Sequence, residues 1–197
     1  MARMAETSPR LWARIAGVLY LLIFIAAPTG AATATPVKMI ITLACDTGVA
    51  LIFYVLLKPV SMRLSVLAAF FRLIFVAVMA VNSLNYFGVL DLFNGARSVT
   101  AFNKGYGVAL VPFGVHCALI GYLIFKSIFL PRILGVLMAL AGLGYLIFLW
   151  PPLGRHLFFP YIVIPGVAGE GALTLWLLVV GLDAGRWDEQ ASAAVER

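Results

Sequence analysis

Long apolar runs, separated by short polar segments, dominate the pattern of this 197-residue chain. About 20 apolar residues in a helix are enough to cross the hydrocarbon core of a bilayer. We therefore predict six membrane-spanning helices, in the ranges 12–28, 37–57, 64–86, 106–125, 133–150 and 161–182. The predicted fold class is an all-α polytopic membrane bundle.

Composition agrees with this pattern, because 63% of the residues are hydrophobic and 11% are charged, against roughly a quarter charged in soluble domains. Small residues follow the first run, as they would after a signal peptide, but the run is long and we favour a retained helix. We expect an N-terminal segment over 1–11, one six-helix domain over 12–182, and a tail over 183–197 that is a solvated end.

The basic residues lie at the ends of the apolar runs and form no stripe, which argues against nucleic acid as a partner. A cytoplasmic N-terminus places most of them inside, as the positive-inside rule requires. Both termini are then cytoplasmic, in the inner membrane of a bacterium. The inside set is Arg3, Arg10, Arg14, Lys58, Arg63, Lys126, Arg132, Arg186 and Arg197, and the outside set is Arg97, Lys104 and Arg155.

Four ionisable residues interrupt four different spans: Asp46, Arg72, His116 and Glu170. At 1.5 Å rise per residue from the cytoplasmic end of each span, they lie roughly 17, 12, 14 and 18 Å deep, respectively. Charged side chains at this depth are costly when they face lipid, so they are expected to turn inward and to meet one another or water. This shared layer is the main functional signal in the sequence.

An arginine cannot become neutral, so Arg72 needs a partner. Asp46, on the neighbouring helix of a tight hairpin, is the expected one, and Glu170 or His116 could share the guanidinium. Two interpretations stay open for the Arg72–Asp46 pair, since a buried ion pair can serve a function or only set the helix register. His116 could instead bond a backbone carbonyl freed by Pro112.

We assign provisional roles on chemical grounds. Glu170 and Asp46 are candidates for acid–base chemistry, because a carboxyl that can hold a proton beside a histidine suits such a role. Arg72, His116, Asn82 and Asn85 are candidate ligand-binding residues, the two asparagines as the lining of a path from outside.

No cofactor or metal is expected, because the chain has no motif with metal-ligand spacing and Arg72 opposes a cation in the same layer. Both cysteines, Cys45 and Cys117, fall in apolar runs and no disulfide is expected. Two sets of small residues predict close helix contacts, and a homodimer along such a face is possible. These sets are Gly107, Gly114 and Gly121 in the fourth span and Gly135, Ala139 and Gly142 in the fifth.

Three stretches, "LIFYVLLKPVSMRLSVLAAFFRLIF", "GYLIFKSIFLPRILGVLMALAGLGYL" and "GEGALTLWLLVVGL", carry a family resemblance. In order and spacing they resemble the bacterial multi-pass membrane family known as domain of unknown function 4386, over most of residues 12–182. The resemblance implies a compact helical membrane domain and carries over no catalytic residues. Members commonly have a longer segment between the first two spans than the "TGAATATP" found here.

Three functions remain open on this basis. The favoured one is binding of a small or lipophilic ligand at the polar layer, by a carrier or a sensor. The second is an intramembrane acid–base enzyme acting on a prenyl or lipid substrate, in the manner of a terpene cyclase. The third is a structural or accessory subunit in which the layer only fixes helix packing.

Overall fold

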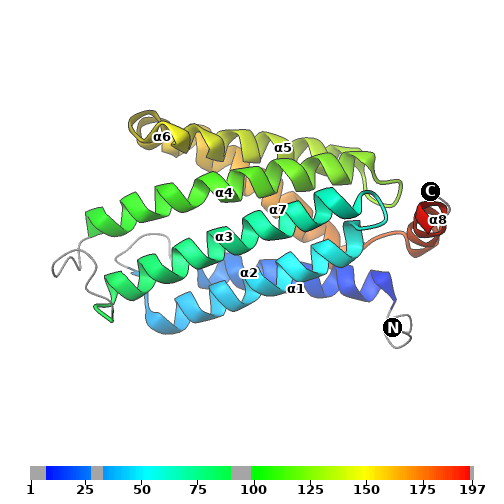
Figure 1. Ribbon diagram of the computed structural model, residues 1–197, viewed down its shortest axis with the longest axis horizontal. Helices are drawn as coiled ribbons and strands as arrows, with labels where there is room; N and C mark the ends of the chain where they lie inside the picture. Colours follow the sequence, from blue (N-terminus) through cyan, green and yellow to red (C-terminus); the bar gives the residue numbers. More distant parts are fainter. Residues whose placement is uncertain (1–7, 28–32, 90–98, 196–197) are drawn as a thin grey trace.

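The computed structural model describes residues 8–27, 33–89 and 99–195, and these ranges are helical and contain no strand (Figure 1). Six segments are long and apolar enough to span a membrane, which confirms the predicted count. The first five are α1 (Pro9–Ala26), α2 (Pro36–Leu57), α3 (Met62–Tyr86), α4 (Val99–Lys126) and α5 (Arg132–Leu146), the last continued by a 3-10 turn, Ile147–Leu149. Arg3, Arg97, Arg197 and most of the linker between the first two spans lie outside the described residues.

The sixth spanning segment is longer than the sequence pattern predicted. It consists of α6 (Pro151–Leu157), a π-helical turn (Phe158–Ile162) and α7 (Val163–Val179). Phe159 has a non-helical backbone conformation, so the chain bends between α6 and α7. The predicted start at residue 161 therefore corresponds to the straight part of this segment.

The six spans form a closed ring. Each helix packs against the next one in the chain, from α1 through α5, and α7 then packs against both α5 and α1. Short turns between α2 and α3 and between α4 and α5 make these pairs antiparallel neighbours, as predicted. The ring has an interior to which all six spans can contribute side chains.

Small residues bring α4 and α5 into backbone contact. A Cβ added at Gly135 would lie 2.6 Å from the carbonyl oxygen of Gly121, and one added at Gly142 would lie 2.7 Å from that of Gly114. Neither position can hold a larger side chain without moving a backbone. The predicted packing role of these glycines is confirmed within the ring.

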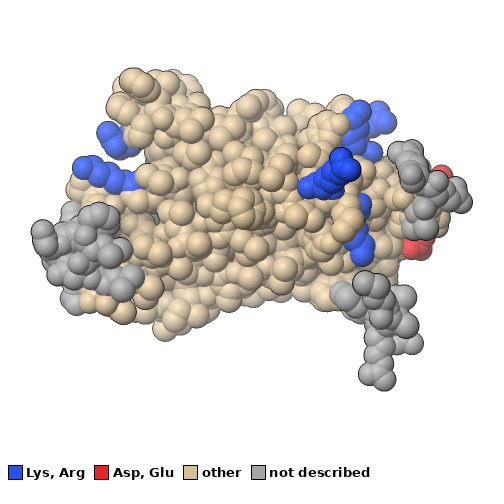
Figure 2. Space-filling view, in the orientation of Figure 1, with Lys and Arg blue, Asp and Glu red and all other residues tan. Residues whose placement is uncertain are grey.

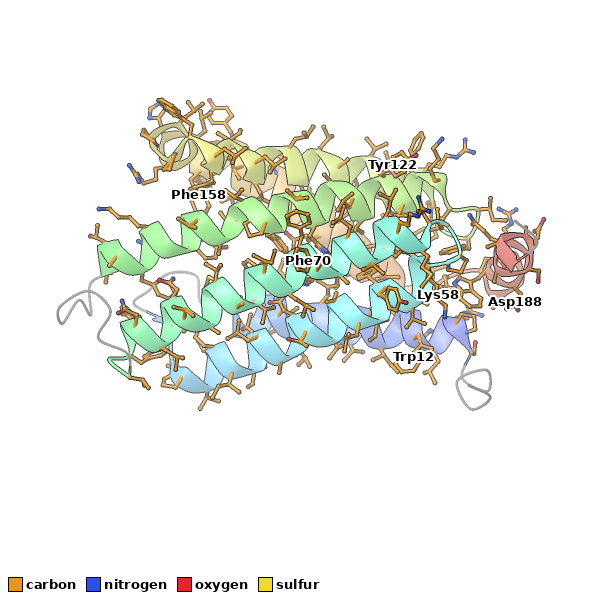
Figure 3. All side chains as sticks on the ribbon, viewed as in Figure 1. Trp12, Lys58, Phe70, Tyr122, Phe158 and Asp188 are labelled. Atoms are coloured by element: carbon orange, nitrogen blue, oxygen red, sulfur yellow. The ribbon has the colours of Figure 1, made fainter. Side chains whose placement is uncertain are left out.

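The tail is more than the solvated end expected from the sequence. Residues Ala184–Val195 form the helix α8, which lies across the end of the bundle where α7 finishes (Figure 1). Trp187 donates from its indole Nε1 to the carbonyl of Leu56 at 2.8 Å, and the Gln190 side chain accepts from the backbone N–H of Ile128 at 3.1 Å. Figure 3 places Lys58, in the α2–α3 turn, and Asp188, on α8, at this same end.

The outer surface has the polarity of a membrane protein. Lys and Arg side chains gather towards the two ends of the face shown in Figure 2, and a band without them lies between. Phe70 on α3 and Tyr122 on α4 belong to this outer surface, at 55% and 49% exposure (Figure 3). The chain is thus a multi-pass membrane bundle, with α1 beginning and α7 ending at the same end of the ring (Figure 1).

Candidate functional site

The guanidinium of Arg72 lies in the interior of the ring and binds side chains from three other helices. Its Nε and Nη2 both donate to Oδ1 of Asp46 on α2, at 3.1 and 2.5 Å. Its Nη1 donates to the hydroxyl of Tyr20 on α1 at 2.6 Å and to Nε2 of His116 on α4 at 3.0 Å. The predicted Arg72–Asp46 ion pair is therefore present, and His116 shares the same guanidinium.

These four side chains form what we call the Arg72 cluster: Arg72, Asp46, Tyr20 and His116. Arg72, Tyr20 and His116 are 0% exposed and Asp46 is 2% exposed. Two aromatic rings also cover the guanidinium, with its Cζ 4.8 Å from the ring centroid of Tyr20 and 5.4 Å from that of Phe113. The cation is thus held by opposite charge, hydrogen bonds and aromatic faces, which together offset its desolvation.

His116 has one possible tautomer in this arrangement. Its Nδ1 lies 2.8 Å from the carbonyl oxygen of Ala68, which can only accept, while Nε2 faces Arg72, which can only donate. The proton is therefore on Nδ1, the imidazole is neutral, and it joins α4 to α3 at two points. Its carbonyl partner is on α3, so the alternative of a carbonyl freed by Pro112 on its own helix is wrong.

Among the described residues, no hydrogen bond joins Glu170 to the Arg72 guanidinium. Glu170 Oε1 accepts a 2.6 Å hydrogen bond from the hydroxyl of Tyr145 on α5, and this pair is the second part of the layer. Glu170 stays half-buried, whereas the Arg72 cluster is fully buried. The ring of Phe113 joins the two parts, because its centroid is 5.3 Å from that of Tyr145.

Each spanning helix contributes a polar side chain to this central layer. Counted at 1.5 Å per residue from the same end of the ring, these side chains lie roughly 14–20 Å deep, which agrees with the depth expected from the sequence. In chain order they are Tyr20 on α1, Asp46 on α2, Arg72 on α3, His116 on α4, Tyr145 on α5 and Glu170 on α7.

The two asparagines lie elsewhere. Asn82 is ten residues beyond Arg72, roughly 15 Å along α3, and its Nδ2 donates to the carbonyl of Phe102 on α4 at 3.1 Å. A Cβ added at Gly105 would overlap the Asn82 side chain, so this glycine makes room for it. Asn85, one turn further on, is buried at 8% exposure. The contacts of Asn82 tie α3 to α4, and its role in a ligand path stays a prediction.

Sequence reasoning missed the two tyrosines of the layer. Tyrosines in membrane proteins gather near the interfaces, where the hydroxyl reaches water. Tyr20 instead stands in the middle of its apolar run, and Tyr145 stands five residues before the end of the run 133–150; a buried phenol needs a hydrogen-bond partner. Their position inside the apolar runs, away from the charged ends, was the signal in the sequence that could have identified them.

Fold and site together define the class of this protein: an integral membrane bundle of six spanning helices with a polar layer inside the ring. Residues 34–181 match the family described as "Domain of unknown function (DUF4386)", and the chain belongs to this family, as the resemblance implied. Asp46, Arg72, His116, Tyr145 and Glu170 lie within the matched range, and Tyr20 precedes it.

One relative is an "Uncharacterized protein" of Archaeoglobus fulgidus. It is 34% identical over 139 residues, which cover 69% of this chain and 76% of that protein. No solved structure matches this chain.

Proposed function

We propose that this protein binds a small or lipophilic ligand beside Glu170, as a carrier or a sensor in the cytoplasmic membrane. The observation that carries the proposal is the contrast between the two parts of the central layer. The members of the Arg72 cluster are buried and bonded to one another. Glu170 keeps accessible surface although it stands at the middle of a spanning helix.

Glu170 belongs to the inward face of α7. Gly166, Leu173 and Leu177 stand four residues before it and three and seven residues after it, so they share its face of the helix, and all three are buried. A Cβ added at Gly166 would overlap the Tyr145 hydroxyl, so this glycine leaves the space through which Tyr145 reaches Glu170. An accessible carboxyl on a buried helix face is suited to meet a ligand inside the bundle.

The groups around Glu170 indicate the kind of ligand. Tyr145 uses one carboxyl oxygen, Oε1, and Oε2 makes no hydrogen bond to any described residue. A ligand with a hydroxyl or amine at one end and an apolar body would match a carboxyl acceptor beside the aromatic ring of Phe113.

The test is untargeted mass spectrometry of small molecules and lipids that co-purify with the protein. Wild type is compared with Glu170→Gln at equal folded yield. The carboxamide keeps an acceptor oxygen for Tyr145 and removes the charge, so the fold is expected to survive. We expect a species enriched on the wild type to be lost from this variant.

Glu189→Gln is the matched control, since it makes the same chemical change at an exposed position on α8. Its profile is expected to equal that of the wild type. Identical profiles for wild type and a well-folded Glu170→Gln protein would overturn the proposal.

A specific observation also favours a structural role for the Arg72 cluster. Arg72 places four short hydrogen bonds on three helices and none of its surface is exposed. A side chain whose donors are bonded to several helices is suited to setting the register of those helices. In this proposal the cluster forms the rigid wall of the site and Glu170 meets the ligand.

A further inference from the structure

A second candidate site lies at the end of the bundle, away from the central layer. It is a groove of about 510 Å³ where the start of α1, the end of α7, the α4–α5 turn and the start of α8 meet. Its walls combine apolar residues with three charged ones. They are Arg10, Ile128, Phe129, Leu130, Pro131, Trp176, Val180, Gly181, Leu182, Asp183, Ala184 and Arg186.

Each of the two arginines in this groove donates a hydrogen bond to a backbone carbonyl. Arg10 donates from Nε to the carbonyl oxygen of Val180 at 3.3 Å. Arg186 donates from Nη1 to the carbonyl oxygen of Ile128 at 3.4 Å. Among the described residues, the two Nη groups of Arg10 make no hydrogen bond, so these donors are available to an anion.

The charge of the groove is positive. Asp183 approaches Arg186, with Oδ2 3.7 Å from Nε, and it is the one carboxylate among the lining residues. Two arginines against one aspartate leave an excess of one positive charge. An oxyanion with several acceptor oxygens, such as a phosphate group, matches guanidinium donors in both geometry and charge.

The groove also borders the lipid-facing surface. Val179 and Val180 at the end of α7 are 72% and 40% exposed, and Leu11 at the start of α1 is 48% exposed. Trp176, partly buried on α7, lines the groove, as expected for an aromatic residue at the level of the headgroups. Acyl chains could therefore lie along α1 and α7 while the attached headgroup enters the groove.

From these features we infer that the groove binds the phosphate of an anionic phospholipid headgroup, between Arg10 and Arg186. This inference is independent of the ligand proposed beside Glu170, because the two sites share no residue. The predicted orientation places the groove at the cytoplasmic leaflet, where anionic lipids attract basic residues.

The test uses the full chain in detergent and native mass spectrometry with added phosphatidylglycerol or phosphatidylcholine. We expect the wild type to prefer phosphatidylglycerol. Removing both charges in Arg10→Gln/Arg186→Gln is expected to weaken phosphatidylglycerol binding by about fivefold for each arginine, or about 25-fold together.

The matched control is Lys58→Gln/Arg63→Gln. It removes the same charge from two exposed basic residues at the same end of the ring, beside the α2–α3 turn, that do not line the groove. Its preference for phosphatidylglycerol is expected to stay within about twofold of the wild type, because distant exposed charges are screened. Thermal unfolding of both double variants establishes that they are folded.

Three results would overturn the inference. The first is equal binding of the two lipids by the wild type, and the second is an equal loss in the control variant, which would indicate general attraction. The third result comes from adding inorganic phosphate alone and measuring thermal unfolding. If inorganic phosphate stabilises the protein as much as phosphatidylglycerol does, and if this effect depends on Arg10 and Arg186, the groove binds a soluble phosphate instead of a lipid.

Discussion

Removing both partners of the buried ion pair should destabilise the fold no more than removing the more damaging partner alone. Arg72→Leu leaves the Asp46 carboxylate without its cation, and Asp46→Leu leaves a guanidinium that cannot lose its charge. Breaking a buried pair in this way costs about 3–5 kcal/mol. Each single variant is therefore expected to lose a large part of the free energy of unfolding.

The double variant leaves no unpaired charge. What remains is the loss of a donor for the Tyr20 hydroxyl and for His116 Nε2, at about 1–3 kcal/mol for each atom. The double variant should therefore be no less stable than the worse single variant. The coupling energy from the double-mutant cycle should reach at least about 3 kcal/mol.

The assay is equilibrium unfolding in mixed micelles, followed by tryptophan fluorescence, for all four proteins of the cycle. The exposed pair Arg186–Asp183, 3.7 Å apart with side chains 65% and 56% exposed, is the internal control. Its coupling in the cycle Arg186→Gln/Asp183→Asn should be about 0–1 kcal/mol. Additive effects at Arg72 and Asp46, within about 0.5 kcal/mol, would refute the reasoning.

Three further predictions concern packing, the tail and topology. Gly135→Ala places a methyl group against the α4 backbone and should lower the free energy of unfolding by about 1–3 kcal/mol in the same assay. Gly171→Ala, where an added Cβ has no atom within 4 Å, should be neutral or slightly stabilising, and equal effects of the two variants would contradict the packing account. Trp187→Phe removes the indole hydrogen bond to α2 and should speed hydrogen exchange of α8, and unchanged exchange would argue against that contact as an anchor. Ser192→Cys, at an exposed position, should react with an impermeant thiol reagent from the cytoplasmic side alone, and labelling from outside would invert the predicted orientation.

The central layer could be anticipated from the sequence because depth follows from counting residues along a helix. Arg72 and Asp46 stand at similar distances from a short turn, so an antiparallel hairpin brings them to the same level. His116 reaches the same level by the same argument through α4. The depth of each polar side chain along its helix axis was therefore predictable.

The partner of Glu170 could not be predicted in this way, because depth does not fix which helices are neighbours across the ring. Glu170 shares its level with Arg72, yet it bonds Tyr145, since α7 packs between α5 and α1. The ring closure that sets this neighbourhood leaves no periodic signal in the sequence. Tyr20 was missed for a related reason, as its helix becomes a neighbour of Arg72 only in three dimensions.

The order of the helices around the ring has a consequence for biosynthesis. A chain emerges N-terminus first, and in this ring each spanning helix meets its predecessor as its first neighbour. Tyr20 and Asp46 are thus already made when Arg72, whose charge is permanent, is synthesised. Likewise Tyr145 precedes Glu170. The charged side chains, which are the most costly to transfer into lipid, can therefore enter the bilayer when their hydrogen-bond partners are already there. Insertion can then proceed one helix at a time without leaving the guanidinium unpaired in lipid.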